Sequence, residues 1–549
     1  MEKNGTAESR LQICILAVIC LVAAFAGNGV FLPDIMESRN IVTAREMVYD
    51  GNWLIPTMNG ELRLEKPPLP TWITAAAEII SPDNLELMRG MAGAAALVLF
   101  FFFYRVAKDL LRVDAVASTL LFVTCYSVVL MAHTASWDIY CHAFMMGGIY
   151  FFGKGITSKG KQLWTFAFSG IMTGLSIMSK GPVSLFALFL PYLIALILCV
   201  RPRMKGKWGG VALMAVIALV VGCWWYAYIY IFHSDALSAV AAKESGAWMN
   251  RNVRPWYYYW KFFLEAGIWS LLLLTSLFLP LFHMRRSKGW ELSAVWMLAA
   301  LLLLSLMPEK KTRYLFPLLI PASYLMGAMI QTWTAEFRHR GGKKKDVAMM
   351  RINSWLLALA VGAVPFLAAI TLYKDGFISV WLLSALSGAC AVCCALLIAS
   401  GVKLRPMMMV WSVALFFAVV EIFFLPAARP LINNPEMNSI ARTREMSSLK
   451  GVDFYSRQGE ELRIEMVYAA HRKIRPIDFS SADSMRKHLP MLVLSHKGAS
   501  QELDPAIFQY ADTLYIGHFD DNRRSVKSGK YNPTFIYHAT LLTPKKTAR

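Results

Sequence analysis

The sequence is poor in charge, and it has no cysteine after Cys394. Only 17% of its 549 residues are charged, whereas 56% are hydrophobic. A soluble protein of this length would be more charged and less apolar. All nine cysteines lie in apolar stretches, so the C-terminal region has no disulfide framework. Cys390, Cys393 and Cys394 have a metal-like or redox-like spacing, but no His or acidic residue accompanies them. We interpret them as helix-packing residues.

Motifs for nucleotides and nucleic acids are also absent. The chain has no P-loop, no dinucleotide-binding glycine fingerprint, no zinc-finger spacing and no internal repeat. We therefore expect no nucleotide cofactor and no nucleotide-sugar donor. The net charge of +20 would suggest nucleic acid in a soluble protein. Here we attribute it to basic loops on one side of a membrane, and we expect no nucleic-acid partner.

Apolar segments of membrane-spanning character recur through the first 426 residues, about 13 in number. They lie at 11–32, 89–106, 115–132, 139–153, 163–178, 183–200, 209–232, 262–283, 291–307, 314–333, 353–373, 378–401 and 407–426. No small-residue cleavage site clearly follows the first segment, which we interpret as an uncleaved span. The sequence predicts a polytopic α-helical membrane protein with about 13 transmembrane helices.

Basic clusters in alternate connections predict the orientation. Four of them are Arg105–Arg112, Arg201–Lys207, Arg338–Lys345 and Lys403–Arg405. The positive-inside rule places these loops and the N-terminus in the cytoplasm. An odd number of spans then places the C-terminus in the periplasm of a bacterial inner membrane. We expect a monomer.

The composition changes after Pro426, where amphipathic stretches alternate with short β-like runs at Val452–Tyr455, Met491–Ser495, Thr513–Ile516 and Phe535–Leu541. This pattern predicts a C-terminal periplasmic α/β domain over 429–549 and a transmembrane domain over 1–428. Within the latter, 33–88 is expected to form the first periplasmic loop, with amphipathic helices. The loop is rich in charged residues and proline, yet also in Trp, Leu and Ile, which argues against disorder.

Several basic residues break the positive-inside pattern, because they fall on the periplasmic side. They are Arg39, Lys66, Lys180, Arg251, Arg254, Lys310, Lys311 and Arg313. A few such residues would be expected merely to reach toward lipid headgroups. Eight of them, spread over separate loops, favour a shared anionic ligand at the membrane surface, such as a polyprenyl phosphate or a lipid A phosphate.

Several motifs together resemble one family. They are Glu37-x-Arg39, the AREM of 44–47, the GNW of 51–53, the NGE-L-x-x-EKPPLP-x-W run ending at Trp72, the KGP of 180–182, the P-W-Y-Y of 255–258 and the K-x-x-x-Y-x-x-P of 310–317. They resemble the bacterial lipid-linked-sugar glycosyltransferases typified by the aminoarabinose transferase that modifies lipid A. These ArnT-like enzymes belong to the GT-C superfamily and are related to protein O-mannosyltransferases.

The resemblance implies the GT-C fold and roles for particular residues. The implied catalytic carboxylates are Asp34, Glu37 and Asp138; the implied donor-phosphate ligands are Arg39, Lys66, Lys180, Lys310 and Tyr314; and the implied acceptor ligands are Arg251 and Arg254. A solvated helix cap is the simpler interpretation of Asp138.

Two positions depart from the family pattern. Met36 stands where the family has the Asp of D-E-x-R, and Asp34 is the nearest replacement. Asn252 stands where the family has a metal-binding His. The resemblance implies a divalent metal ion with Glu65 and Asn252 as ligands. An amide oxygen is a poorer ligand for zinc than for magnesium or calcium.

The sequence thus predicts a glycosyltransferase that moves a sugar from a polyprenyl-phosphate donor to a membrane-associated acceptor, such as lipid A or another envelope glycolipid. One alternative is a protein O-glycosyltransferase of the mannosyl type. A second is a lipid-linked-sugar flippase or transporter. Transporters place ionisable residues near the middle of the membrane and often contain inverted repeats, and the sequence has neither feature. The sugar and the acceptor stay open.

Overall fold

The computed structural model describes residues 9–160, 162–283, 286–340, 342–434, 436–526, 529 and 531–545. The chain forms two compact units. The first comprises Met1–Val30, Leu64–Ile73 and Asp83–Ala428, and the second comprises Phe31–Arg63, Thr74–Pro82 and Arg429–Arg549. The C-terminal segment of the second unit begins at Arg429. Most of the first loop, however, belongs to the C-terminal unit.

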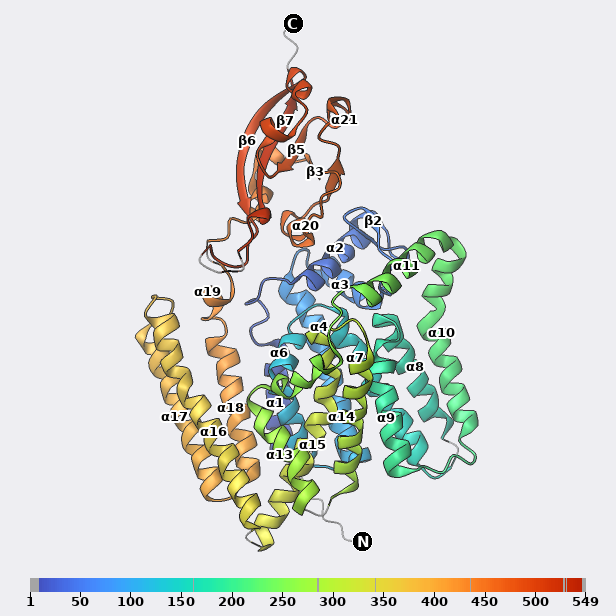
Figure 1. Cartoon of the computed structure of the whole chain (residues 1–549), viewed down its shortest axis with the longest axis vertical. Helices are drawn as coiled ribbons and strands as arrows, with labels where there is room; N and C mark the ends of the chain where they lie inside the picture. Colours follow the sequence, from blue (N-terminus) through green and yellow to red (C-terminus); the bar gives the residue numbers. More distant parts are fainter. Residues whose placement is uncertain are drawn as a thin grey trace. The chain divides into compact units, whose positions relative to one another are not determined.

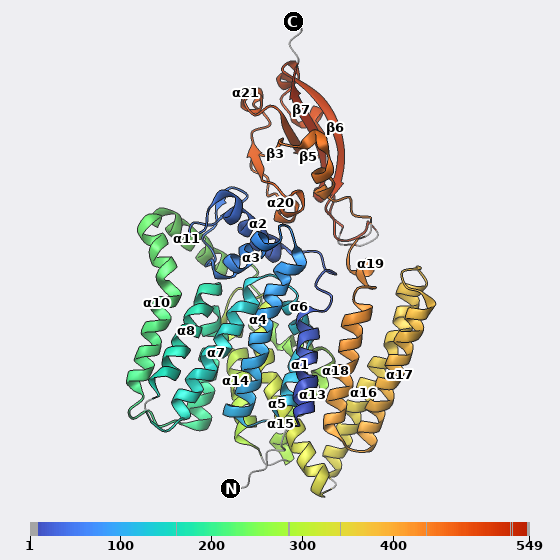
Figure 2. The ribbon, with the colours of Figure 1, turned by 180° about the vertical axis from the view of Figure 1, so that it is seen from behind.

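Helices that lie side by side make up the first unit (Figure 1 and, from behind, Figure 2). In chain order they are α1 (Arg10–Phe25), α4 (Leu85–Arg105), α5 (Ala115–Val123), α6 (Tyr126–Ala132), α7 (Trp137–Thr157), α8 (Leu163–Lys180), α9 (Leu190–Ala195), α10 (Trp208–Phe232), α11 (Ser234–Asn250), α12 (Phe262–Glu265), α13 (Ser270–His283), α14 (Lys288–Leu306), α15 (Phe316–Arg340), α16 (Lys344–Ala368), α17 (Val380–Val402) and α18 (Pro406–Val419). Each apolar segment expected from the sequence falls on one or more of these helices. α3 (Leu69–Ile80) crosses the division between the units.

The prediction of a polytopic helical membrane protein is confirmed. Among the described residues, seven helices are long and apolar enough to cross a membrane, and nine if each bent helix pair counts as one span. The bent pairs are Ala115–Val123 with Tyr126–Ala132, and Trp256–Glu265 with Gly267–Leu281. α1 ends at Phe25, earlier than expected, and Gly27 follows with a φ of 78°.

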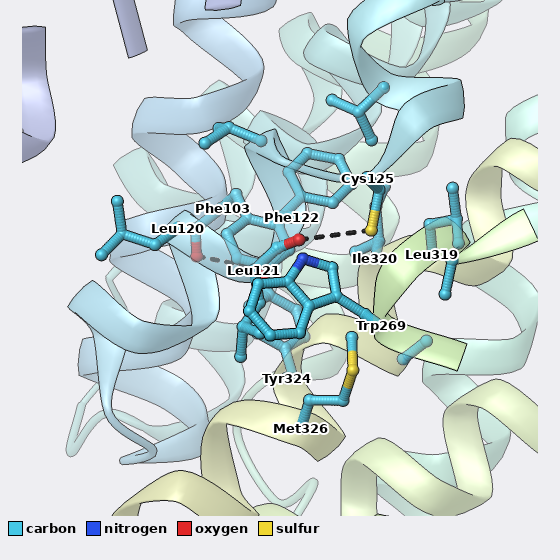
Figure 3. Packing of buried hydrophobic residues seen from close by; sticks show 14 of the residues in the cluster. Phe103, Leu120, Leu121, Phe122, Cys125, Trp269, Leu319, Ile320, Tyr324 and Met326 are labelled. Carbon is cyan, nitrogen blue, oxygen red and sulfur yellow. Dashed lines mark hydrogen bonds between the residues drawn. The ribbon is translucent and has the colours of Figure 1, made fainter. Parts of the chain in front are cut away.

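Aromatic side chains from distant helices fill the centre of the first unit (Figure 3). The Phe103 ring stacks on Phe122 at 4.4 Å and on Tyr324 at 4.1 Å, measured between ring centroids. The buried indole of Trp269 donates to the Thr124 hydroxyl at 2.8 Å. This bond satisfies the one polar atom of the ring, as a buried tryptophan requires.

A five-stranded sheet forms the body of the second unit, in the order β4-β3-β5-β7-β6. The strands are β3 (Asp453–Arg457), β4 (Ile474–Ile477), β5 (Met491–Ser495), β6 (Ala511–Asp520) and β7 (Ile536–Pro544). β3 pairs in parallel with β4 and β5, whereas β7 pairs antiparallel with β5 and β6. The predicted C-terminal α/β domain is therefore confirmed. β4 was not predicted, because its sequence IRPI contains a proline and an arginine and has little β character.

The central strand β5 is buried on both of its faces. On β5, Leu492 and Leu494 join one buried apolar cluster, while Met491 and Val493 join another. Successive side chains of a strand point to opposite faces, so a continuous apolar run indicates burial on both sides. The first cluster also contains Val42, which is 4% exposed and lies in the first loop. Burial of Val42 explains why this loop forms part of the C-terminal unit.

Candidate active site

In the second unit, helix α2 (Ile35–Asp50) carries three of the predicted residues. Asp34 is its N-cap, and the carboxylate accepts from the backbone N–H groups of Met36 at 2.9 Å and Glu37 at 2.8 Å. Such caps satisfy amides that have no partner within the helix. Gly51 ends the helix with a φ of 78°, a conformation that glycine adopts at little cost. Asp34 thus has a structural role in addition to its predicted catalytic one.

Glu37 and Arg39 follow the cap within the first turns of α2. Glu37 is 1% exposed and lies near the positive end of the helix dipole, which stabilises a carboxylate. Arg39 is half-buried. Its backbone carbonyl accepts from the guanidinium of Arg63 at 2.8 Å, and Arg63 also donates to the Thr43 hydroxyl at 2.8 Å. Arg63 was not among the predicted residues, because only tertiary packing shows that it lies against α2.

In the first unit, Asp138 and Lys180 form an ion pair. Asp138 is in the first turn of α7, and Lys180 is the last residue of α8, where Gly181 turns the chain with a φ of 71°. The two residues are only 2% and 6% exposed. A buried pair of this kind depends on both partners, because either charge alone would be costly to bury. The pair is inconsistent with Asp138 being merely a solvated cap.

A second cluster of charges contains Tyr314 and a carboxylate that the sequence analysis did not single out. Glu309 is 4% exposed and accepts from Lys311 at 2.7 Å, Arg251 at 3.4 Å and the Tyr314 hydroxyl at 3.4 Å. The Tyr314 ring lies 5.8 Å from the ammonium of Lys180. Tyr314 therefore connects this cluster to the Asp138–Lys180 pair, and we call the whole set the cationic cluster. An acid directly before a Lys-Lys pair was the available sequence signal for Glu309.

The other predicted residues of the first unit are Lys310, which directly follows Glu309, Arg254, which lies three residues after Arg251, and Lys66 of the EKPP segment. Lys310 is 4% exposed and donates to the Met307 carbonyl, and burial lowers the pKa of its ammonium. Its backbone N–H donates to the carbonyl of Asn252 at 3.1 Å. Arg254 is exposed. Lys66 lies 4.0 Å from Glu244 on α11, an ion-pair partner that the sequence analysis did not identify.

The predicted metal site gains no support from the side chains around it. Among the described ranges, no three His, Cys, Asp or Glu side chains gather as metal ligands would. Glu65 is half-buried, and one of its carboxylate oxygens is buried with no hydrogen-bond partner in the described part of the chain. Asn252 is exposed, at a φ of 53°. The ligand roles of Glu65 and Asn252 stay predictions.

Comparisons with known proteins agree with this architecture. Residues 65–226 match the family model described as dolichyl-phosphate-mannose-protein mannosyltransferase. The undecaprenyl phosphate-alpha-4-amino-4-deoxy-L-arabinose arabinosyl transferase 1 of Pseudomonas fluorescens (strain Pf0-1) is 27% identical over 467 residues, which are 81% of this chain and 79% of that protein. The corresponding transferase of Pseudomonas aeruginosa (strain PAO1) is 26% identical over 448 residues, or 77% of each chain.

A solved structure matches the fold over almost the whole chain. The crystal structure of ArnT from Cupriavidus metallidurans bound to undecaprenyl phosphate has a TM-score of 0.64 and 16% sequence identity, and it covers 96% of this chain and 97% of that one. The fold and the sequence relatives lead to the same assignment. The chain is similar in sequence to the ArnT-like glycosyltransferases and shares the GT-C fold of a solved ArnT.

Proposed function

We propose that this protein transfers a sugar from a polyprenyl phosphate to a membrane-bound acceptor, at the periplasmic face of the bacterial inner membrane. The names of its sequence relatives support an undecaprenyl-phosphate-linked sugar as the donor. The observation that carries the proposal is the cationic cluster, in which Lys180, Lys311, Arg251 and the Tyr314 hydroxyl surround two buried carboxylates. Cations and a hydroxyl donor held in a partly dry site are suited to binding a phosphate.

The chemistry of the reaction needs such a cluster. The bond between the anomeric carbon and the phosphate oxygen breaks, and its electron pair leaves with the polyprenyl phosphate. An acceptor oxygen forms the new bond to the anomeric carbon from the opposite side, so direct displacement inverts that centre. The leaving phosphate gains negative charge, which Lys180 and the Tyr314 hydroxyl would stabilise more strongly in the transition state than in the bound donor.

The nature of the acceptor decides whether a base is needed. A phosphate acceptor, such as a lipid A phosphate, is already nucleophilic, whereas a hydroxyl must lose a proton to a carboxylate. Asp138 is poorly suited to accept that proton, because Lys180 already neutralises it. The Asp34 carboxylate is already engaged by two backbone hydrogen bonds, from Met36 and Glu37. These contacts favour a phosphate acceptor.

Reconstitution with defined acceptors tests the proposal. The purified protein in liposomes would receive a polyprenyl-phosphate-linked sugar together with lipid A, dephosphorylated lipid A or a Ser/Thr-rich peptide. We expect mass spectrometry to find one added sugar on lipid A and none on the dephosphorylated form. Glycosylated peptide would instead support the mannosyltransferase alternative, which the description of the matching family model favours. A folded protein that modifies none of these acceptors with any tested donor would refute the proposal.

Cysteine labelling tests the side of the membrane. Glu61 and Lys343 are both exposed in the structure. In a cysteine-free background, an impermeant reagent applied to intact spheroplasts should label Glu61→Cys and leave Lys343→Cys unlabelled. The reverse pattern would overturn the orientation, and with it the periplasmic active site.

A further inference from the structure

Within the second unit, the C-terminal domain contacts helix α2 in its middle and at both ends. The apolar face of α2 packs on α20 (Ile464–Ala470), and Val42 lies in the same buried cluster as Met466 and Val467. The buried guanidinium of Arg45 donates to the Tyr468 carbonyl at 2.9 Å and lies 4.8 Å from the centre of the Tyr468 ring. α2 thus belongs to the same unit as Arg429–Arg549, although more than 370 residues separate the two in the sequence.

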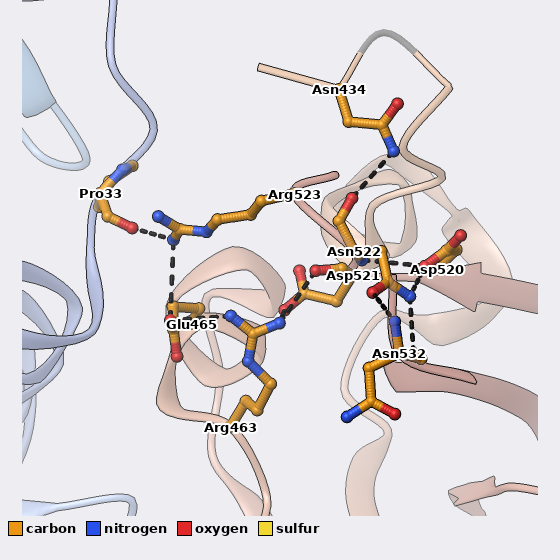
Figure 4. Close-up of polar contacts among 9 residues, drawn as sticks. All are labelled: Pro33, Asn434, Arg463, Glu465, Asp520, Asp521, Asn522, Arg523 and Asn532. Carbon is orange, nitrogen blue, oxygen red and sulfur yellow. Dashed lines mark hydrogen bonds and ion pairs between the residues drawn. The ribbon is translucent and has the colours of Figure 1, made fainter. Parts of the chain in front are cut away.

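Arg523 holds the N-terminal end of α2. Its guanidinium donates to the carbonyl of Pro33, the residue directly before the Asp34 cap. The same guanidinium lies 3.8 Å from Glu465, and Glu465 accepts from Arg463 at 2.9 Å (Figure 4). A chain of charged side chains therefore runs from the body of the domain to the first turn of α2. Asn433 adds a weaker contact, since its side-chain oxygen accepts from the Leu32 N–H at 3.4 Å.

Two contacts hold the other end of α2 and the hairpin that follows it, which consists of β1 (Thr57–Met58) and β2 (Glu61–Leu62). Lys473 pairs with Asp50, the last residue of α2, at 2.7 Å. The Asn59 side chain donates to the Ile474 carbonyl at 2.7 Å and accepts from the Ile474 N–H at 2.8 Å. The amide thereby pairs with the backbone of edge strand β4 as a neighbouring strand would. Asn59 has a φ of 57°, a conformation that asparagine tolerates better than most residues.

A helix held at both ends cannot shift along its axis without breaking these contacts. Glu37 and Arg39 lie on this helix, three and five residues after the Asp34 cap, so their positions depend on its placement. A displacement of about 1 Å in a catalytic group lowers the reaction rate about a hundredfold. The position of α2 should therefore affect the rate of transfer.

We infer that the C-terminal domain is a clamp that positions helix α2 for catalysis, with Arg523 and Asn59 as positioning residues. The inference rests on the proposed function for the chemistry, but the clamp itself is a structural arrangement that can be tested without any substrate.

Hydrogen exchange of the full-length protein provides that test. In Arg523→Ala, the amides of α2 should exchange about tenfold faster than in the wild type, because local opening of this helix becomes easier. The amides of β5, in the middle of the sheet, should be unchanged. Arg524→Ala is the matched control, since Arg524 is exposed and next in sequence. Unchanged exchange in α2, or equal acceleration in α2 and β5, would overturn the clamp.

Kinetics then tests the catalytic consequence. Arg523→Ala and Asn59→Gly should each lower kcat about tenfold or more, because Glu37 and Arg39 lose their fixed placement on α2. Glycine is chosen at residue 59 because it keeps the positive φ. Arg523→Lys should recover part of kcat, since an ammonium can donate to the Pro33 carbonyl. Wild-type kcat in both variants would refute the inference, whereas an inactive wild type would refute only the proposed function.

Discussion

The Asp138–Lys180 pair allows a sharp test of whether Lys180 binds the donor phosphate or only neutralises a buried acid. Their side chains are 3% and 5% exposed. Removing one partner from such a pair typically costs about 3–5 kcal/mol, since the other charge is left buried without compensation. Lys180→Met and Asp138→Asn should therefore each lower the thermal midpoint of the detergent-solubilised protein. The double variant should recover most of that loss, because it buries no charge.

Activity should follow a different pattern from stability. If Lys180 binds the phosphate, the double variant should be as inactive as Lys180→Met, with transfer reduced about 10²–10³-fold. The assay is transfer of a radiolabelled sugar at saturating acceptor, with each thermal midpoint measured on the same preparation. If activity returned together with stability in the double variant, Lys180 would serve only to neutralise Asp138. The assignment of the phosphate site would then be wrong.

Three further outcomes are expected. Lys66→Ala should reduce transfer about 10²–10³-fold, whereas Lys343→Ala in the predicted cytoplasmic loop should have little effect; equal effects in the transfer assay would contradict the phosphate-site assignment. Asp34→Asn should keep the thermal midpoint, because asparagine caps helices as well as aspartate does. Any loss of transfer in that variant would therefore come from the missing charge. Asp34→Ala should lower the thermal midpoint, because it removes the cap. Burial raises the pKa of Asp521 to about 6 despite its contact with Arg463 at 3.2 Å, so the unfolded chain loses this proton at lower pH than the folded protein does. Stability from this group should fall as pH rises from about 4 to about 6 and then level off; Asp521→Asn should remove that part of the slope of the thermal midpoint against pH, and an unchanged slope would contradict it.

The sequence predicted the class of protein and the layout of its elements. Each apolar segment falls on the helices of the first unit, and four of the five strands of the C-terminal sheet lie where short β-like runs were seen. These features depend on consecutive residues. An apolar run of membrane length indicates a spanning helix, and alternation of apolar and polar residues over a few positions indicates a strand, whatever the distant contacts are. The family motifs are equally local, which is why the GT-C fold could be expected from them.

The candidate site was predicted only in part, for a physical reason. Asp138 and Lys180 were singled out, but their ion pair joins residues 42 positions apart, and the sequence alone could not show it. The Glu309 contact with Arg251 joins residues 58 positions apart. Charged residues on separate loops can be grouped by their side of the membrane, but packing decides which of them touch.

Tertiary structure also decided to which unit the first loop belongs. Chain order suggested that 33–88 is part of the transmembrane domain, whereas most of this loop packs with the C-terminal domain. The deciding contacts, such as Asn59 with Ile474 and Arg523 with Pro33, join residues 415 and 490 positions apart. A run of local sequence encodes helix α2 and its cap. The packing of helix α2 on the C-terminal domain depends instead on burial and hydrogen bonds between residues far apart in the sequence. These contacts form only when the chain folds.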